Sequence, residues 1–144
     1  MTIPTPEHGL VLHYSYLWHG EYQAGEDAGR KDRPSVIILR VEAEEKDGTT
    51  VVTVLPITHT APRKTGTAVE IPLAVKKHLG LDDSPSWVVV NEGNEFMWPG
   101  YDMKKVPKTK KYTYGFLPPA LFNKIRSAFV AFHKTGKTKI TPRS

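Results

Sequence analysis

The residues of this sequence most suited to chemistry are an arginine and a threonine that flank two neighbouring apolar segments. Arg33 precedes the β-rich run 34–41, and Thr58 follows a second such run, 51–57. Asp47-Gly48 between the runs is typical of a tight turn, so we expect the runs to pair as an antiparallel hairpin. The start of one strand and the end of the other then lie at the same edge, where Arg33 and Thr58 can face each other. A guanidinium offers a fixed fork of hydrogen-bond donors that suits anionic oxygens.

Sequence signatures of cofactors, metals and the common hydrolases are absent. The chain contains no P-loop, no GxGxxG motif after a strand, no GxSxG and no HExxH. Its six histidines include no pair at the four-residue spacing that places two ligands on one helical face, and it has no cysteine. We therefore expect no bound metal, no cofactor, no disulfide and no thiol nucleophile.

Charge is distributed unevenly along the chain. Residues 1–102 hold nine Lys or Arg and all fifteen Asp or Glu, a balance of 9 − 15 = −6, whereas residues 103–144 hold eleven Lys or Arg and no acid, a balance of +11. Basic side chains bind phosphates by displacing counterions, so the asymmetry favours a polyanionic partner. A solvated basic surface explains the same charges equally well, and both interpretations stay open.

The elements that must position Arg33 and Thr58 are mostly short strands. The alternation of Leu10, Leu12, Tyr14 and Tyr16 predicts a half-buried strand. The segment 19–32 has no periodicity, and we expect a long loop there. Further strands are predicted at 68–71, 87–90, 95–98 and 112–116, a short helix at 73–79, and a C-terminal amphipathic helix after Pro118-Pro119. This helix carries the apolar stripe Leu121, Phe122, Ile125, Ala128, Phe129 and Phe132.

Together these elements predict a mainly β, α+β fold, a small barrel with the C-terminal helix packed onto it. At 144 residues the chain has the length of one domain, with a core at about 8–134 and a basic, flexible tail at 135–144. The N-terminus lacks the basic start and apolar run of a signal peptide, and no apolar run approaches the roughly 20 residues of a membrane span. We therefore expect a cytoplasmic protein without a membrane anchor.

Several short motifs occur in the order and spacing of a known toxin family. They are Gly9-Leu10-Val11, Glu26-Asp27-Ala28-Gly29, Arg33-Pro34, Pro56-Ile57-Thr58, Val88-Val89-Val90-Asn91-Glu92 and Tyr114-Gly115-Phe116-Leu117-Pro118. Over residues 8–134 the chain thereby resembles the PemK/MazF family of type II toxin–antitoxin toxins.

The resemblance implies an SH3-like barrel, a homodimer, an antitoxin partner, and metal-independent cleavage of single-stranded RNA at a short recognition sequence. It assigns Arg33 and Thr58 to catalysis. In this chemistry the 2′-hydroxyl of RNA attacks the neighbouring phosphorus and leaves a cyclic phosphate. An arginine suits the extra negative charge of the transition state, but it is too basic to accept the proton.

Other residues are candidates for binding RNA. Trp18 can stack on an unpaired base, and Asn91 and Glu92 can contact base edges, although such a pair is also common in turns. His59 adjoins Thr58, and histidine titrates near neutral pH, but strand neighbours point to opposite faces, so the proton acceptor stays open. Asn91 stands where some family members carry a carboxylate. This favours the alternative of a non-catalytic SH3-like module that binds RNA or protein.

Overall fold

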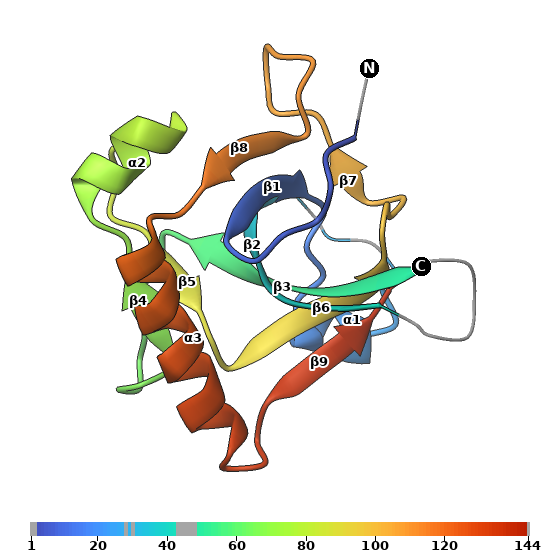
Figure 1. The fold of residues 1–144 in the computed structure, drawn as a ribbon. Coiled ribbons are helices and arrows are strands. Elements are labelled where there is room, and N and C mark those ends of the chain that lie inside the picture. Colours follow the sequence, from blue (N-terminus) through green and yellow to red (C-terminus); the bar gives the residue numbers. More distant parts are fainter. Residues whose placement is uncertain (1–2, 28, 30, 43–48, 144) are drawn as a thin grey trace.

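In the computed structural model, residues 3–27, 29, 31–42 and 49–143 are described. The helices are α1 (His19–Gln23), α2 (Leu73–Leu79) and α3 (Pro119–His133). The strands are β1 (Leu10–Tyr14), β2 (Arg33–Glu42), β3 (Thr50–Thr58), β4 (Ala68–Glu70), β5 (Trp87–Val89), β6 (Glu92–Met97), β7 (Met103–Lys104), β8 (Thr113–Phe116) and β9 (Lys139–Pro142). Figure 1 shows α2 and α3 together at one side of the strands, with α1 away from them near β9.

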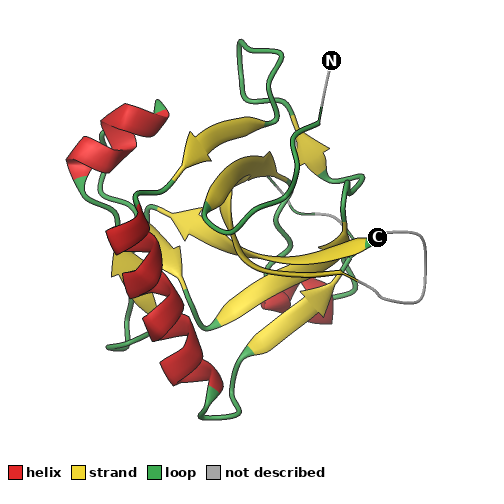
Figure 2. Cartoon of the chain, viewed as in Figure 1, coloured by secondary structure: helices red, strands yellow, loops and turns green. Residues whose placement is uncertain are grey.

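The strands form one mostly antiparallel sheet built around β2 and β3. The main order is β4-β5-β3-β2-β1-β7. Strand β3 pairs with β6 through its first half and with β5 through its end, while β1 pairs with both β8 and β7. The mainly β, α+β prediction is confirmed, and Figure 2 shows the strands curving around the interior with the helices outside. The sheet is open, because β4 and β7 each pair with a single strand among the described residues, so the ladder does not close into a barrel.

The sheet packs on both faces, and the period of two along its strands divides the side chains between two cores. On β1, Val11 enters a core beneath α2 and α3, whereas Leu10, Leu12 and Tyr14 enter a second core with Phe96. Strand β1 is therefore buried along its whole length rather than half-buried as its alternation predicts. The first core also receives Leu121 and Ile125 of the predicted helical stripe.

The predicted β2–β3 hairpin is confirmed. Ser35 pairs with Pro56 and Val36 with Leu55. Its Asp47-Gly48 turn lies outside the described residues. The helix at 73–79 is also confirmed, and Gly80 ends it in the left-handed conformation, with φ of 71°, where glycine lacks the strain of a Cβ.

Two segments differ from their predictions. Residues 19–23 form helix α1 instead of the predicted loop, because five residues are too few to show a helical period in the sequence. At the start of this helix, the Glu21 carboxylate accepts a hydrogen bond from the backbone N–H of Trp18 at 3.0 Å. The tail is not frayed at Lys139–Pro142, because β9 pairs in parallel with β6 and Arg143 forms an ion pair with Asp102 at 2.8 Å. None of the described helices has the length and apolar character needed to cross a membrane.

Candidate functional site

A pocket of about 460 Å³ opens where β2 begins and β3 ends. Ser35 pairs with Pro56, so Arg33 and Thr58, each two residues further toward this edge, approach it together. Both line the pocket, as the hairpin geometry predicts. Trp18 and His59 line it too. The structure thus brings together four of the six residues that the sequence singles out.

Arg33 is half-buried, and its guanidinium lies against an aromatic face. The Cζ atom is 4.9 Å from the centre of the Trp18 ring, within the range of a cation–π contact. Burial lowers the pKa of Arg33, against the nearby Glu21 carboxylate and the Tyr16 hydroxyl, which raise it. An arginine so placed stays charged at neutral pH. Its Nε is buried and has no hydrogen-bond partner among the described residues, so the site holds a cation with unused donor capacity.

Thr58 ends β3 with its side chain almost fully buried. Its Oγ1 accepts the backbone N–H of Thr60 at 3.2 Å. A hydroxyl that accepts a hydrogen bond keeps its own proton to donate. Thr58 can therefore donate to an oxygen of a group held in the pocket, next to the positive charge of Arg33.

Trp18 is held in place by a network behind it. Tyr16 contacts the Trp18 ring edge to face at 5.1 Å and donates its hydroxyl proton to Glu92 Oε1 at 2.9 Å. The same oxygen accepts the backbone N–H of His19 at 3.0 Å. Burial raises the pKa of the Glu92 carboxyl, while the hydrogen bonds from His19 and Tyr16 lower it. Tyr16 itself is buried in the second core.

A second pocket of about 600 Å³ adjoins the first. The two share Trp18, Thr58 and Thr60 as walls, and the second also takes in Asn91 and Glu92. Each of the six sequence-predicted residues therefore lines at least one of two adjacent pockets. Glu92 is the first residue of β6 rather than part of a turn.

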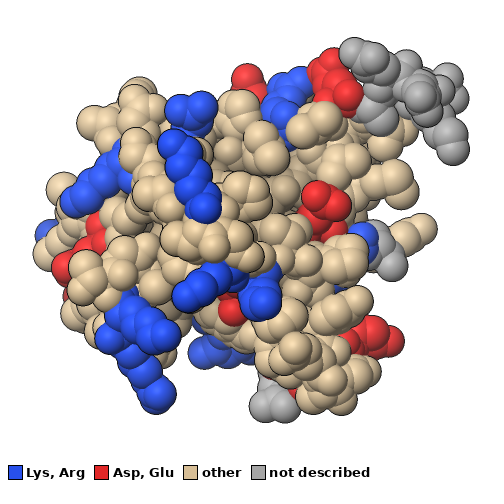
Figure 3. Space-filling model, turned by 90° about the horizontal axis from the view of Figure 1, so that it is seen from below, with Lys and Arg blue, Asp and Glu red and all other residues tan. Residues whose placement is uncertain are grey.

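The basic side chains that line the two pockets come from the acidic part of the chain. They are Lys31, Arg33 and Arg63. On the face shown in Figure 3, Lys and Arg side chains lie in separate groups with neutral surface between them. None of the residues that line the two pockets comes from the basic segment 103–144.

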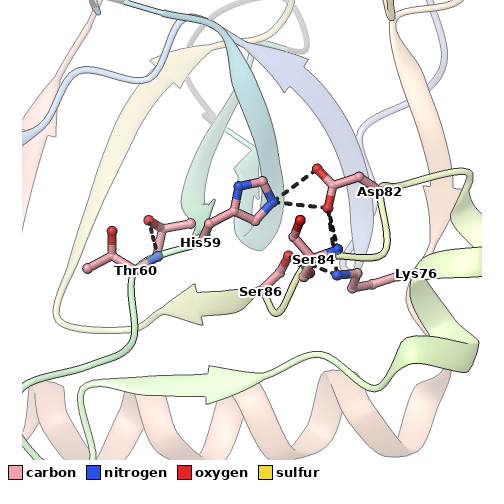
Figure 4. A network of polar contacts seen from close by, with 7 residues as sticks. His59, Thr60, Lys76, Asp82, Ser84 and Ser86 are labelled. Atoms are coloured by element: carbon pink, nitrogen blue, oxygen red, sulfur yellow. Dashed lines mark hydrogen bonds and ion pairs between the residues drawn. The ribbon is translucent and has the colours of Figure 1, made fainter.

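His59 forms a contact that the sequence does not reveal. Its Nε2 lies 3.1 Å from Oδ1 and 3.0 Å from Oδ2 of Asp82, a residue that also lines the first pocket (Figure 4). The sequence predicts that His59 points away from Thr58, because neighbouring residues on a strand point to opposite faces. That alternation does not apply here, because β3 ends at Thr58 and His59 belongs to the loop that follows. Asp82 lies 23 residues away in what reads as an ordinary Asp-Asp-Ser-Pro turn, so no local pattern marks it.

Groups of three or more His, Cys, Asp or Glu arranged to hold a metal are not found in the part of the chain that the structure describes. The chemistry of the pocket is that of a fixed guanidinium, a donating hydroxyl and a histidine–carboxylate pair. This combination suits a phosphate group.

A family model described as PemK-like, MazF-like toxin of type II toxin-antitoxin system matches residues 17–94. The matched segment is 78 residues long (94 − 17 + 1), more than half of the 144. The chain belongs to this family. No curated protein and no solved structure matches the chain.

The match to the PemK-like family runs from the residue before Trp18 into β6. It contains all six predicted site residues and Asp82. As a PemK-like toxin of a type II system, the protein is expected to have an antitoxin as its partner. Helix α3 and strand β9 lie beyond the matched segment.

Proposed function

We propose that this PemK-like protein is a metal-independent endoribonuclease that cleaves single-stranded messenger RNA at a specific sequence and thereby inhibits growth. The observation that carries the proposal is the meeting of Arg33 and Thr58 in one pocket. Both present hydrogen-bond donors, and the arginine adds a permanent positive charge.

The proposed reaction uses the 2′-hydroxyl of RNA as the nucleophile. Its oxygen attacks the adjacent phosphorus, the bond to the 5′ oxygen breaks, and one product ends in a 2′,3′-cyclic phosphate. Arg33 stabilises the doubly charged phosphorane through its fork of donors, and Thr58 donates to another phosphate oxygen. Removing one such preorganised donor typically costs about 100- to 1,000-fold in rate.

Recognition of the RNA falls to the rest of the two pockets. Trp18 is partly buried and lines both pockets, where an unpaired base can stack on its ring. Asn91 offers an amide donor and acceptor for a base edge. Glu92 Oε1 is already occupied by two donors, so Glu92 serves mainly to hold Trp18 and α1.

The proposal also covers the oligomeric state of the protein, its compartment and its antitoxin partner. By family resemblance the toxin acts in the cytoplasm as a homodimer, and the antitoxin inhibits it by covering the RNA-binding pockets with an acidic segment. Among the lining residues, Lys31, Arg33 and Arg63 offer cations to such a segment.

A second candidate function is a non-catalytic module that binds RNA or protein through the same pockets. The observation in its favour is Asn91, whose amide cannot accept a proton where some family members have a carboxylate. In that case the pockets would bind RNA and leave it intact.

Cleavage in the presence of EDTA separates the two candidates. We expect wild type to cut a labelled pool of single-stranded RNA at a defined sequence, and Arg33→Ala to lose the activity. Arg126→Ala is the matched control, because it removes the same charge from an exposed position on α3 that lines neither pocket. Intact RNA with wild type, despite measurable binding, would establish the non-catalytic module instead.

A further inference from the structure

The proton acceptor of the proposed reaction is missing from the pair formed by Arg33 and Thr58. A candidate must lie in their pocket, carry a free lone pair and have a partner that stabilises it once protonated. Among the described residues that line the first pocket, His59 and Asp82 together meet these conditions.

We infer that His59, oriented by Asp82, is the general base that removes the proton from the attacking 2′-hydroxyl. This inference rests on the proposed ribonuclease function. His59 is the catalytic residue, and Asp82 is a positioning residue that acts through it.

The contact with Asp82 sets the state of the imidazole. Both carboxylate oxygens lie within 3.1 Å of Nε2, so Nε2 carries the hydrogen and donates it. The lone pair is then on Nδ1, which is turned away from Asp82 in Figure 4. A carboxylate on one nitrogen also stabilises the imidazolium that forms when the other accepts a proton. Slightly more than half of the His59 side chain is exposed, so a substrate can reach it.

Two further contacts hold the Asp82 carboxylate in place. Its Oδ1 accepts the backbone N–H of Ser84 at 3.1 Å and lies 3.7 Å from the ammonium of Lys76. Lys76 is buried, with 1% of its surface exposed, and donates to Ser86 Oγ at 3.2 Å (Figure 4). A buried ammonium requires a carboxylate nearby, so this arrangement holds Asp82 at the pocket.

The step balances without a metal or a further reagent besides water. The 2′ oxygen forms a bond to phosphorus as its proton passes to Nδ1 of His59. The bond from phosphorus to the 5′ oxygen breaks with its electron pair, and the departing oxygen takes a proton from water. The imidazolium returns its proton to the solvent and the site is restored.

Two carboxylates are the competing acceptors. Asp32 lines the first pocket as an exposed side chain, and Glu92 lines the second with one oxygen already holding two hydrogen bonds. The charged side chains that share the first pocket with His59 are therefore of both signs: Lys31, Asp32 and Arg33, and Asp82. Lys76 contacts Asp82 from α2. The test therefore includes variants of Asp32 and Glu92.

The experiment measures single-turnover cleavage of a defined RNA in EDTA as a function of pH. We expect His59→Ala to lose about 100-fold or more in rate, the usual contribution of a general base, while binding an uncleavable 2′-deoxy analogue as wild type does. His78→Ala is the matched control, an exposed histidine on α2 that lines neither pocket. Wild type should speed up with pH across the range in which histidine titrates, His59→Ala should lose that dependence, and imidazole in the buffer should partly restore it.

Asp82→Asn keeps a similar shape and an oxygen near Lys76 but removes the negative charge opposite its ammonium, so urea denaturation is used to check that the variant is folded. It should slow cleavage, move the pH dependence and leave binding unchanged. The inference is overturned if His59→Ala cuts within about threefold of wild type with the same pH profile, a change too small for general base catalysis. It is also overturned if Asp32→Asn or Glu92→Gln removes the dependence instead. Loss of activity in Arg33→Ala alone would leave the ribonuclease proposal standing, whereas an inert wild type would end both.

Discussion

The guanidinium carbon of Arg33 lies 4.9 Å from the centre of the Trp18 ring, so the proposed catalytic cation and the proposed base-stacking surface form one unit. Trp18 limits the orientations open to Arg33 and shields it from water. Phosphate and base are thereby expected to bind side by side. Trp18 lines both pockets.

Arg33→Lys tests whether the shape of the cation matters as well as its charge. Lysine keeps the charge but presents a single ammonium on a flexible stem, so the fork of donors and the stacking on Trp18 are lost. We expect single-turnover cleavage to fall by about 100-fold with RNA binding changed little. Arg126→Lys should cut as wild type does. Equal rates for Arg33→Lys and wild type would mean that Arg33 acts as a simple point charge.

Trp18→Ala should weaken RNA binding. Stacking of a base on an aromatic side chain contributes about 1–3 kcal/mol, which corresponds to roughly 5- to 150-fold in affinity. Trp18→Phe should recover part of the loss. Fluorescence anisotropy with an uncleavable 2′-deoxy analogue measures this effect apart from catalysis.

The control for Trp18 is Tyr101→Ala, which removes an aromatic ring that is 87% exposed and lines neither pocket. Its affinity for RNA should equal that of wild type. Unchanged binding by Trp18→Ala would show that the ring serves only to pack against Arg33 and Tyr16.

Asn94→Ala should destabilise the protein from a site outside the pockets. The Asn94 side chain is fully buried; its Oδ1 accepts the Leu17 N–H at 2.9 Å and its Nδ2 donates to the Leu17 carbonyl at 2.8 Å. The same Oδ1 also accepts a hydrogen bond from Arg143 Nη1 at 2.9 Å. Alanine leaves these buried groups without partners, at a cost of about 2–4 kcal/mol in the free energy of unfolding. Urea denaturation measures the cost, and a loss below about 1 kcal/mol would mean that water replaces the amide.

Glu92→Gln should change how stability depends on pH. Burial raises the pKa of the Glu92 carboxyl above its value in the unfolded chain. The folded state therefore holds this proton more tightly, and the stability gained from it is full at low pH and lost as the pH rises through the folded pKa. Glutamine does not titrate and keeps an oxygen for Tyr16 and His19. Its unfolding free energy relative to wild type should thus rise as the pH increases from about pH 4, near which a free glutamate titrates.

Urea denaturation at a series of pH values checks the Glu92 prediction. A constant difference between Glu92→Gln and wild type would show that burial does not affect ionisation of the carboxyl. A difference that falls with pH would mean that the charged form is the one stabilised in the folded protein.

Local patterns in the sequence were enough to predict the part of the fold that places Arg33 and Thr58. The β2–β3 hairpin follows from two β-rich runs, and its antiparallel register carries both residues to one edge. Helix α2 could be predicted as well, because Pro72 and Gly80 mark its two ends.

Features that depend on long-range contacts could not be predicted. Strand β9 has no alternating pattern and exists because β6 pairs with it in parallel, with Glu92 opposite Lys139. Asp82 reads as a turn residue, and only the folded chain places it against His59. The role of Glu92 behind Trp18 likewise depends on Tyr16, 76 residues away.

The most direct test of the account is the fate of one RNA phosphodiester in EDTA, with a ribose or a 2′-deoxyribose at the scissile nucleotide. We predict that the all-ribose substrate is cut to a fragment ending in a 2′,3′-cyclic phosphate, that the single 2′-deoxy substitution abolishes cleavage while binding persists, and that Arg33→Ala cuts neither substrate. Cleavage of the 2′-deoxy substrate, or a product ending in a free 3′-hydroxyl, would contradict the account.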